Sequence, residues 1–600
     1  MTDIAGATVG PARLTAAHIG LAAIGLMWTL PFLQPIHAAP LTSFYGDWLT
    51  LALGLLALGT MAGRSCWQHA SFPVLALPLA GFVVVIAIQY GIGRIVYGGQ
   101  ALAVVLYLAW AILMAALAAT LRRAIGLEGM ATVLAWFVAV AGVLAAVLGV
   151  LQHYQISDLP HTLVVPKLSA AVYGNLAQYN HFANFCSLAL ASLAFLYASR
   201  RVHWAAVAAG AAPIVFVIGV SGSRSSLLFL AVLILLALLY AWRGGAGGRR
   251  LWVTVTLFAA GFALAQWLAT APGLAAGSAT ETVSQRLMGG EGSSGAINIA
   301  HRLQLAREAW EMFLATPLLG AGWGQFPWHD FSYRALNGPP IETWPFNHAH
   351  NIVLHLLAVT GLAGTLLVAG SAALWAWGLR RAAVDLTHWW LLALLAVIAV
   401  HSLLEHPLWF ANFLGIAAVV LGLSSGDNLP MRLGRAGRVV APLVAAAGLL
   451  YLLLIMSAYR GFERLFLAAP QLPGANEYHA ILARAHREPL LRPYAELAIA
   501  SGLPLDGGRL REKLELNGRV MRFAPVAGVV YRQAILLALA GEADAAASQF
   551  SRAARVYPID LPTAIRILNE HAPRHPVELT PLIKLAEIEI ARRRAAQGRR

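Results

Sequence analysis

Charged residues are scarce in this chain. Asp, Glu, Lys and Arg make up only 12% of its 600 residues, whereas 59% of the residues are hydrophobic. The mean hydropathy of +0.68 lies outside the range of soluble globular proteins. The scarcity of charge therefore excludes an ordinary soluble protein and points to many membrane-spanning segments.

Cysteine and metal-binding acidic motifs are also scarce. The only cysteines are Cys66 and Cys186, which the predicted topology puts in a cytoplasmic loop and within a span, so we expect no disulfide. No Asp-x-Asp motif is present to hold a metal ion at a diphosphate. Acidic residues are outnumbered by basic ones, 27 to 42, which gives a net charge of +15. We attribute this excess to membrane topology and do not expect a nucleic-acid partner.

Long apolar runs fill most of the chain. Roughly 20 apolar residues cross a bilayer as a helix, and about thirteen such runs predict an all-α polytopic membrane protein. The predicted spans cover about residues 16–33, 44–62, 72–93, 100–121, 130–151, 174–198, 203–220, 226–242, 251–271, 351–377, 388–402, 407–424 and 439–458.

The basic residues predict the orientation of these spans. Loops on the cytoplasmic side of a membrane protein carry an excess of Lys and Arg. Most arginines fall in loops on one predicted side, whereas the short loops opposite hold only Arg94, Lys167 and Arg224. The N-terminus is therefore expected in the cytoplasm, and an odd number of spans leaves the C-terminal part outside. The cytoplasmic set is Arg13, Arg64, Arg122, Arg123, Arg200, Arg201, Arg243, Arg249, Arg250, Arg380, Arg381, Arg432, Arg435 and Arg438.

Two hydrophilic segments interrupt the apolar pattern and divide the chain. Long ordered loops in compact proteins are more often functional than idle, so we expect the first segment to carry functional residues. The predicted parts are N-terminal transmembrane helices (1–271), a large outer loop (272–350), C-terminal transmembrane helices (351–458) and an outer helical domain (459–600).

Polar residues cluster where the sixth predicted span begins. The stretch YGNLAQYNHFANF places five amide or imidazole side chains within ten residues. Polar groups at membrane depth usually mark a pathway or a site, so the cluster predicts a polar cavity wall. Alternatively, it is a helix start whose amides bond to neighbouring helices. The residues are Asn175, Gln178, Asn180, His181 and Asn184.

Two arginines lie on the predicted outer side. Arg224, in SGSRSS, could contact a ligand or extend to the lipid headgroups. Arg302 borders the apolar stripe of a helix that Asn298 could cap, and such a helix could contact a ligand or simply be amphipathic and solvated. The stripe consists of Leu303, Ala306, Trp310 and Phe313.

Two histidines precede the tenth predicted span, in WPFNHAHNIVLHLL. His348 and His350 could form a metal-binding pair, but zinc normally needs three or four ligands and the spacing matches no standard site. A histidine at a helix start can also be a structural cap. Acid–base chemistry is the favoured interpretation, because imidazole titrates near neutral pH and Asn347 or Asn351 could orient it.

These residues match a family pattern. His350-Asn351, followed after nine residues by Gly361 and then by Gly364, reproduces the H-[NSQ]-x9-G-x-x-[GTY] signature of the O-antigen ligase/polymerase (Wzy_C) superfamily. The stretch PLLGAGWGQF is also similar to that superfamily. GNLAQYNHFANF and HSLLEHPLWFANFLG resemble its PglL-type branch of bacterial protein O-oligosaccharyltransferases.

The resemblance implies a GT-C-type glycosyltransferase of the bacterial inner membrane that needs no metal or cofactor. Its donor would be an oligosaccharide linked to undecaprenyl diphosphate, and its acceptor a periplasmic protein such as a pilin. His350 matches the essential histidine of the family, and Arg224 and Arg302 match its donor-binding arginines. The expected supporting residues of the cavity are Asn175, Gln178, Asn180, His181, His348, Asn351 and Glu405.

The expected reaction suits these residue types. Transfer of a sugar to an alcohol requires removal of the hydroxyl proton, for which a neutral imidazole is suited. Guanidinium groups stabilise the negative charge of a departing diphosphate. Two alternatives stay open. The same chemistry could serve lipid A–core or another lipid-linked glycan, as in a ligase or polymerase, or the chain could transport lipid-linked glycan, although we find no repeated halves typical of transporters.

The tail has soluble composition and a repeat-like pattern. Ala546, Phe550, Ala553 and Pro558 have the spacing of the second helix of a tetratricopeptide repeat. Hairpins of this kind form concave surfaces. The tail could therefore engage a protein acceptor, or it could be a structural cap on the membrane domain.

Overall fold

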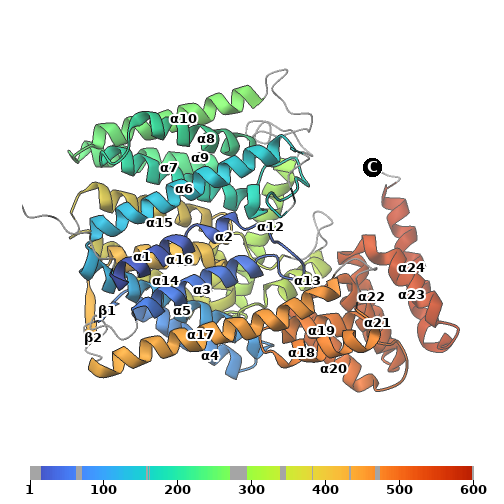
Figure 1. The fold of residues 1–600 in the computed structure, drawn as a ribbon. Coiled ribbons are helices and arrows are strands. Elements are labelled where there is room, and N and C mark those ends of the chain that lie inside the picture. The colour runs from blue at the N-terminus through green and yellow to red at the C-terminus, as the bar shows by residue number, and fades with distance from the viewer. Residues whose placement is uncertain are drawn as a thin grey trace, which may run out of the picture.

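A bundle of long helices and a smaller helical domain beside one end of it make up the protein (Figure 1). The computed structural model describes residues 15–61, 70–156, 160, 162–269, 294–337, 346–381, 383–431, 434–466 and 473–597. Four residues used in the topology prediction lie outside the described residues, namely Arg13, Arg64, Cys66 and Arg432.

Each predicted span corresponds to an apolar helix of the bundle. Among the described residues, eight helices are long and apolar enough to cross a membrane, with α1 and α2 counted as one, and five shorter apolar helices lie in the same bundle. The chain is therefore an all-α, multi-pass membrane protein, as predicted. In chain order the bundle contains α1 (Ala16–Met27), α2 (Leu30–Leu33), α3 (Phe44–Thr60), α4 (Ala76–Gly91), α5 (Gly98–Ile125), α6 (Leu127–His153), α7 (Tyr179–Ala198), α8 (Trp204–Val220), α9 (Ser225–Trp242), α10 (Gly248–Ala269), α14 (Ile352–Leu379), α15 (Leu386–Ser402), α16 (Ala411–Ser424) and α17 (Gly434–Glu463).

The most enclosed helix is α7. It packs against α6, α8, α9, α10 and α15, and almost all of its residues are buried. The predicted span began too early here, because Gly174–Leu176 forms a short 3-10 turn (η2) and Ala177 is left-handed, with φ +56°. The helix starts only after Gln178, which caps it. Polar residues in its first turns therefore point into the bundle, not toward lipid.

A short strand pair interrupts the all-helical pattern. Strand β1 (Ala70–Pro73) pairs antiparallel with β2 (Asn428–Met431), at the end of the bundle away from the C-terminal domain (Figure 1). The third predicted span, placed from residue 72, was therefore wrong at its start, since α4 begins at Ala76. A proline lacks the backbone donor of a ladder, but a two-stranded pair has only edge strands and tolerates it.

The predicted outer loop contains two helices, α12 (Ser294–Ala315) and α13 (Phe326–Asn337). Because α12 begins at Ser294, Asn298 is not at its N-terminus; the side chain of Asn298 lies outside the described residues. The face of α12 that packs is formed by Leu305, Ala309 and Met312. The stripe named from the sequence lies elsewhere, with Leu303 and Trp310 59% and 47% exposed.

The C-terminal domain is a stack of short helices with its own core. The expected hairpin is formed by α21 and α22, and Ala546, Phe550 and Ala553 are buried in it. The domain contacts the bundle where Tyr97, just before α5, donates to Glu496 at 2.9 Å. Its helices are α18 (Ala475–Arg487), α19 (Arg492–Ser501), α20 (Leu510–Phe523), α21 (Ala527–Leu539), α22 (Ala543–Val556), α23 (Leu561–His571) and α24 (Pro576–Gln597).

Candidate active site

A histidine and a glutamate from distant segments meet in the bundle. His350 lies two residues before α14, and Glu405 lies in the turn after α15. Nδ1 of His350 is 2.9 Å from Oε2 of Glu405. Glu405 is buried, and its backbone N–H donates to the carbonyl of His401 at 2.8 Å, which continues the last turn of α15. The site therefore pairs an imidazole with a fixed carboxylate.

The backbone turns sharply at His350. Its φ angle of +49° is in the left-handed region, which costs a non-glycine residue roughly 1–3 kcal/mol. The next residue, Asn351, caps α14, because its Oδ1 accepts from the backbone N–H groups two and three residues on. The N–H of His350 lies 3.3 Å from Nδ1 of His348. The His-Asn pair thus starts the helix while leaving the His350 side chain directed toward Glu405.

Glu405 is surrounded by hydrogen-bond donors. Its Oε1 accepts from Nδ2 of Asn180 at 3.0 Å and lies 3.5 Å from Nη2 of Arg302. Nδ1 of His406 lies 3.7 Å from Oε2, the oxygen that His350 contacts. Burial acts to raise the pKa of Glu405, but its interactions with the two histidines outweigh burial and hold that pKa well below its usual value. Glu405 is therefore an ionised acceptor.

The charge of Glu405 decides which nitrogen of a neutral His350 carries the proton. A carboxylate only accepts hydrogen bonds, so Nδ1 must donate and the lone pair lies on Nε2. The His350 side chain retains 19% of its surface exposed. Nε2 of His350 is consequently the atom that can take a proton from a substrate.

Arg224 reaches the same cluster through its neighbour. Oγ of Ser223 donates to Oδ1 of Asn180 at 2.7 Å, and Asn180 donates to Glu405. Arg224 is the next residue, half-buried at the N-terminus of α9. Arg302 therefore contacts Glu405 directly, whereas Arg224 is the residue that follows a member of its hydrogen-bond network.

His348 also belongs to the cluster. Its ring centroid lies 4.0 Å from that of His350 and 3.5 Å from that of His406. Burial lowers the pKa of His348, and the neighbouring imidazoles lower it further. A neutral His348 can pack against the other two rings without charge repulsion.

Asn175, Gln178 and His181 have other partners. The side chain of Asn175 exchanges its hydrogen bonds with backbone groups. Gln178 accepts from the N–H of His181 to cap α7, and the buried His181 ring lies 4.5 Å from that of Phe410. The structure thus brings Asn180 to the histidine–glutamate pair and puts its three neighbours into the supporting framework.

Two members of the cluster were not assigned to it from the sequence. Neither His406 nor Ser223 was among the residues expected in the cavity. Each directly adjoins a residue that was named, Glu405 and Arg224 respectively. Both residues could therefore have been found from the sequence by including the immediate neighbours of each named polar residue.

Part of the cluster has the composition of a metal site. His348, Glu405 and His406 offer ligand atoms that all lie within 4.8 Å of one another, and two imidazoles with a carboxylate are donors that zinc accepts. However, Oε2 of Glu405 already contacts His350. A metal ion at these residues would compete with His350 for that oxygen.

The GAGWG loop packs against α14 at Gly361, so two glycine-containing motifs are in contact beside the site. Helix α14 breaks at Gly361, where φ is +62°. The carbonyls of Ala358 and Val359 instead accept backbone hydrogen bonds from the GAGWG loop, at 2.9 and 3.1 Å. A Cβ atom on Gly320 of that loop would lie 2.4 Å from the nitrogen of Thr360, so the close approach requires glycine. Of the residues in the family signature, His350-Asn351 therefore stands at the start of this helix and Gly361 breaks it.

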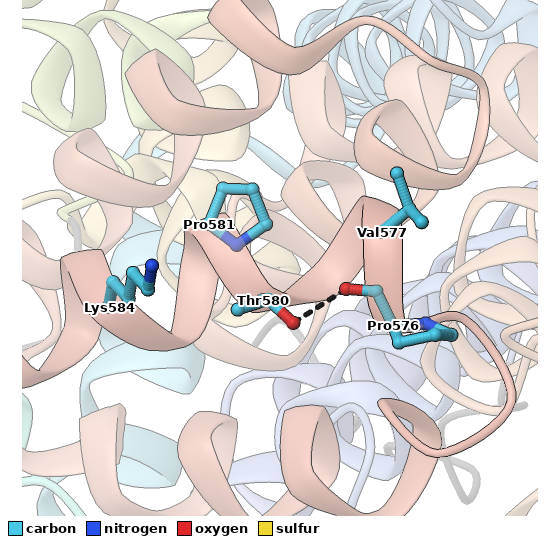
Figure 2. A pocket seen from close by; sticks show the side chains of 5 residues that line it. All are labelled: Pro576, Val577, Thr580, Pro581 and Lys584. Carbon is cyan, nitrogen blue, oxygen red and sulfur yellow. Dashed lines mark hydrogen bonds between the residues drawn. The ribbon is translucent and has the colours of Figure 1, made fainter.

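A hollow on α24 lies apart from this chemistry. It is lined by Pro576, Val577, Thr580, Pro581 and Lys584 (Figure 2). The hydroxyl of Thr580 donates to the carbonyl of Pro576. With one cation and no acid–base pair among these five residues, the hollow lacks the groups that sugar transfer requires.

Known proteins match this chain over most of its length. The family model described as O-Antigen ligase matches residues 209–369, which include α12, α13 and the His350 segment. A second model, described as Virulence factor membrane-bound polymerase, C-terminal, matches residues 389–566. The General O-oligosaccharyltransferase of Acinetobacter baylyi (strain ATCC 33305 / BD413 / ADP1) is 27% identical over 403 residues, which cover 66% of this chain and 68% of that protein.

These matches confirm the prediction made from the motifs. The second model runs from α15 into the C-terminal domain, so the similarity extends beyond the His350 segment. This chain resembles the PglL-type protein O-oligosaccharyltransferase branch of the O-antigen ligase superfamily.

Proposed function

We propose that this chain is an O-oligosaccharyltransferase that moves a preassembled oligosaccharide from undecaprenyl diphosphate to Ser or Thr of periplasmic proteins such as pilins. The observation that carries the proposal is the contact between His350 and the ionised Glu405, with Arg302 on the same carboxylate. This arrangement supplies a base and a cation within one cluster. The name of the Acinetobacter relative supports the protein acceptor.

In the proposed reaction, Nε2 of His350 accepts the proton of the acceptor hydroxyl. The acceptor oxygen then forms a bond to the anomeric carbon of the first sugar, and the bond from that carbon to the diphosphate oxygen breaks. Undecaprenyl diphosphate leaves with the bonding electrons, and the proton remains on His350 until it passes to solvent or to the leaving group. Glu405 keeps Nδ1 protonated throughout and stabilises the imidazolium that forms.

Arg302 and Arg224 are assigned to the departing diphosphate. Planar guanidinium groups form paired, charge-assisted hydrogen bonds with phosphate oxygens. Arg302 keeps 37% of its side chain exposed while contacting Glu405, so donors on its guanidinium remain available to a ligand. We assign the neutralisation of the diphosphate to arginine and none of it to a metal ion.

The proposed orientation puts the site, the 272–350 loop and the 459–600 domain on the periplasmic side of the bacterial inner membrane, with the N-terminus in the cytoplasm. The basic residues of the loops support it. Alkaline phosphatase fused after residue 470 should be active, and after residue 385 inactive. The reverse pattern would contradict the proposal, because the donor glycan would then be on the other side from the site.

The decisive experiment is transfer in vitro with purified chain, a lipid-linked oligosaccharide and a pilin, followed by intact-mass measurement of the pilin. We expect a mass increase of one whole glycan, absent with His350→Ala. Lipid A–core in place of pilin tests the ligase alternative, which the description of the first family model favours. A transporter would still move donor across vesicles after loss of His350 and would transfer nothing to either acceptor.

A further inference from the structure

Three ionisable side chains are buried together behind the histidine segment. Glu308 of α12 and Asp330 and Arg334 of α13 are each at most 2% exposed. Nη1 of Arg334 lies 3.5 Å from Oδ2 of Asp330. Buried charges are costly unless they are paired and hydrogen-bonded, so these three side chains must have partners that offset the cost of burial. The reaction proposed above uses none of them.

Asp330 holds the segment that carries His350. Its Oδ2 accepts from the backbone N–H of Phe346 at 2.9 Å. Phe346 lies four residues before His350, and the centroids of the two rings are 5.7 Å apart. The carboxylate therefore fixes both the backbone that leads to His350 and a ring packed against the imidazole.

The same carboxyl group is connected to α12. Nε2 of Gln304 donates to Oε1 of Glu308. Oε2 of Glu308 and Oδ1 of Asp330 are buried without a conventional hydrogen-bond partner among the described residues. Burial, with the charge of Asp330, raises the pKa of Glu308 to about 9, so Glu308 carries a proton at neutral pH and can donate it to Asp330. Arg302 lies six residues earlier on the same helix.

Helix α13 is in turn built into the C-terminal domain. Phe331 and Ala335 belong to the hydrophobic core of that domain. Nη1 of Arg555, on α22, donates to the carbonyls of Ala335 at 2.7 Å and Leu336 at 3.2 Å, in the last turn of α13. A cation at this end also favours the helix dipole. Arg552, also on α22, donates to Ser332 at 3.2 Å.

We propose that Asp330 is a positioning residue of the transfer reaction, which fixes the His350 segment and the Arg302 helix to each other and to the C-terminal domain. The inference rests on the proposed function of His350 and Arg302. It makes the C-terminal domain part of the scaffold of the site, in addition to any contact with an acceptor. Misplacement of a catalytic group by about 1 Å can cost about 100-fold in rate.

The test compares Asp330→Ala with Glu308→Gln in the full-length protein. Asp330→Ala should lower kcat about 10- to 100-fold with little change in KM for the acceptor, because the base is misplaced while the acceptor surface is retained. Glu308→Gln is the matched control, since it keeps a neutral donor of the same shape at the neighbouring position, and it should transfer within about threefold of wild type at pH 7. Equal kcat for Asp330→Ala and wild type would overturn the inference.

A pH profile gives a second, independent reading. The titratable and charged groups that interact with Glu308 are Asp330, Arg334 and Tyr333 of α13. Arg334 in turn interacts with His301 of α12 and with Tyr557 of the C-terminal domain. Wild-type kcat should fall as Glu308 ionises above pH 9, and Glu308→Gln should lack that fall. If Asp330→Ala is not monodisperse, this comparison decides: the same alkaline fall in both proteins overturns the inference. Transfer by His350→Ala, measured in parallel, would instead contradict the proposed function.

Discussion

Two carboxyl clusters in this protein are similarly buried but differ in their surroundings. Glu405 has donors on both oxygens, an amide and a guanidinium on Oε1 and the imidazole of His350 on Oε2, and a ring nitrogen of His406 lies 3.7 Å away. Glu308 and Asp330 instead face each other and share Arg334. The first cluster is therefore ionised, and the second retains a proton at neutral pH. The number and kind of donors, more than depth alone, determine the protonation state of a buried carboxyl group.

The two states suit different tasks. An ionised carboxylate can hold an imidazole in one tautomer and stabilise its protonated form, which is what the proposed base requires. Two carboxyl groups that share one proton carry a charge of −1, which Arg334 neutralises, so the cluster joins two helices without placing net negative charge beside an anionic donor. The following predictions test this division from the largest expected effect to the smallest.

Loss of His350 should have the largest effect. His350→Ala removes the only group of the Glu405 cluster assigned as base, and general-base catalysis supplies roughly 10²–10⁴-fold. Transfer should fall near or below detection while the protein stays monodisperse in detergent. His348→Ala should be milder, because Nε2 of His350 keeps its orientation through Glu405. The intact mass of the pilin measures transfer by each variant. An inactive His348→Ala together with an active His350→Ala would show that His348, not His350, is the base.

Glu405→Gln should come next. The amide can donate to Nδ1 of His350, which would leave the proton on Nε2 and remove its lone pair from the acceptor. We expect roughly a 100-fold loss or more in kcat, with a far smaller change in donor binding. Single-turnover rates at saturating donor measure this step. A rate within threefold of wild type would show that the charge of Glu405 does not orient the base.

The arginines should show an intermediate effect. Lys cannot reproduce a paired guanidinium contact, so Arg302→Lys and Arg224→Lys should not restore function. Loss of one charge-assisted hydrogen bond costs about 1.5–3 kcal/mol, or roughly tenfold to a hundredfold at subsaturating donor. Arg307→Lys is a suitable control, because Arg307 is exposed on the same helix as Arg302. Wild-type turnover in both Lys variants would show that these arginines have a structural role and do not bind the diphosphate.

The sequence allowed the helices to be predicted because apolar runs are local features, and each run predicted a span. The capping residues were harder to predict: the cap expected at Asn298 was wrong because α12 begins at Ser294, and Asn351, which caps α14, was expected only to orient the histidine. The contact between Asn180 and Glu405 joins residues 225 positions apart. It depends on how α7 and α15 pack, which no local pattern specifies.

Helix α12 shows a second limit. Its apolar stripe was visible, yet Leu303 and Trp310 are exposed while the polar Glu308 is buried. The apolar residues that do pack, Leu305, Ala309 and Met312, also recur at helical spacing, so apolar periodicity alone does not identify the packed face. The role of Asp330 was hidden for a similar reason, since its partner Phe346 lies beyond α13 and is reached only through the fold.

The smallest expected effect is that of chelators. If arginine neutralises the diphosphate, EDTA should leave kcat within about twofold of the untreated enzyme. The comparison of clusters sharpens this expectation, because a metal at His348, Glu405 and His406 would take the oxygen that orients His350. Added zinc should therefore slow transfer, and His406→Ala should weaken that inhibition by removing one ligand. The opposite outcome would be strong inhibition by EDTA that a divalent metal reverses. That outcome would show that a metal ion neutralises the diphosphate and that Glu405 is a ligand of the metal.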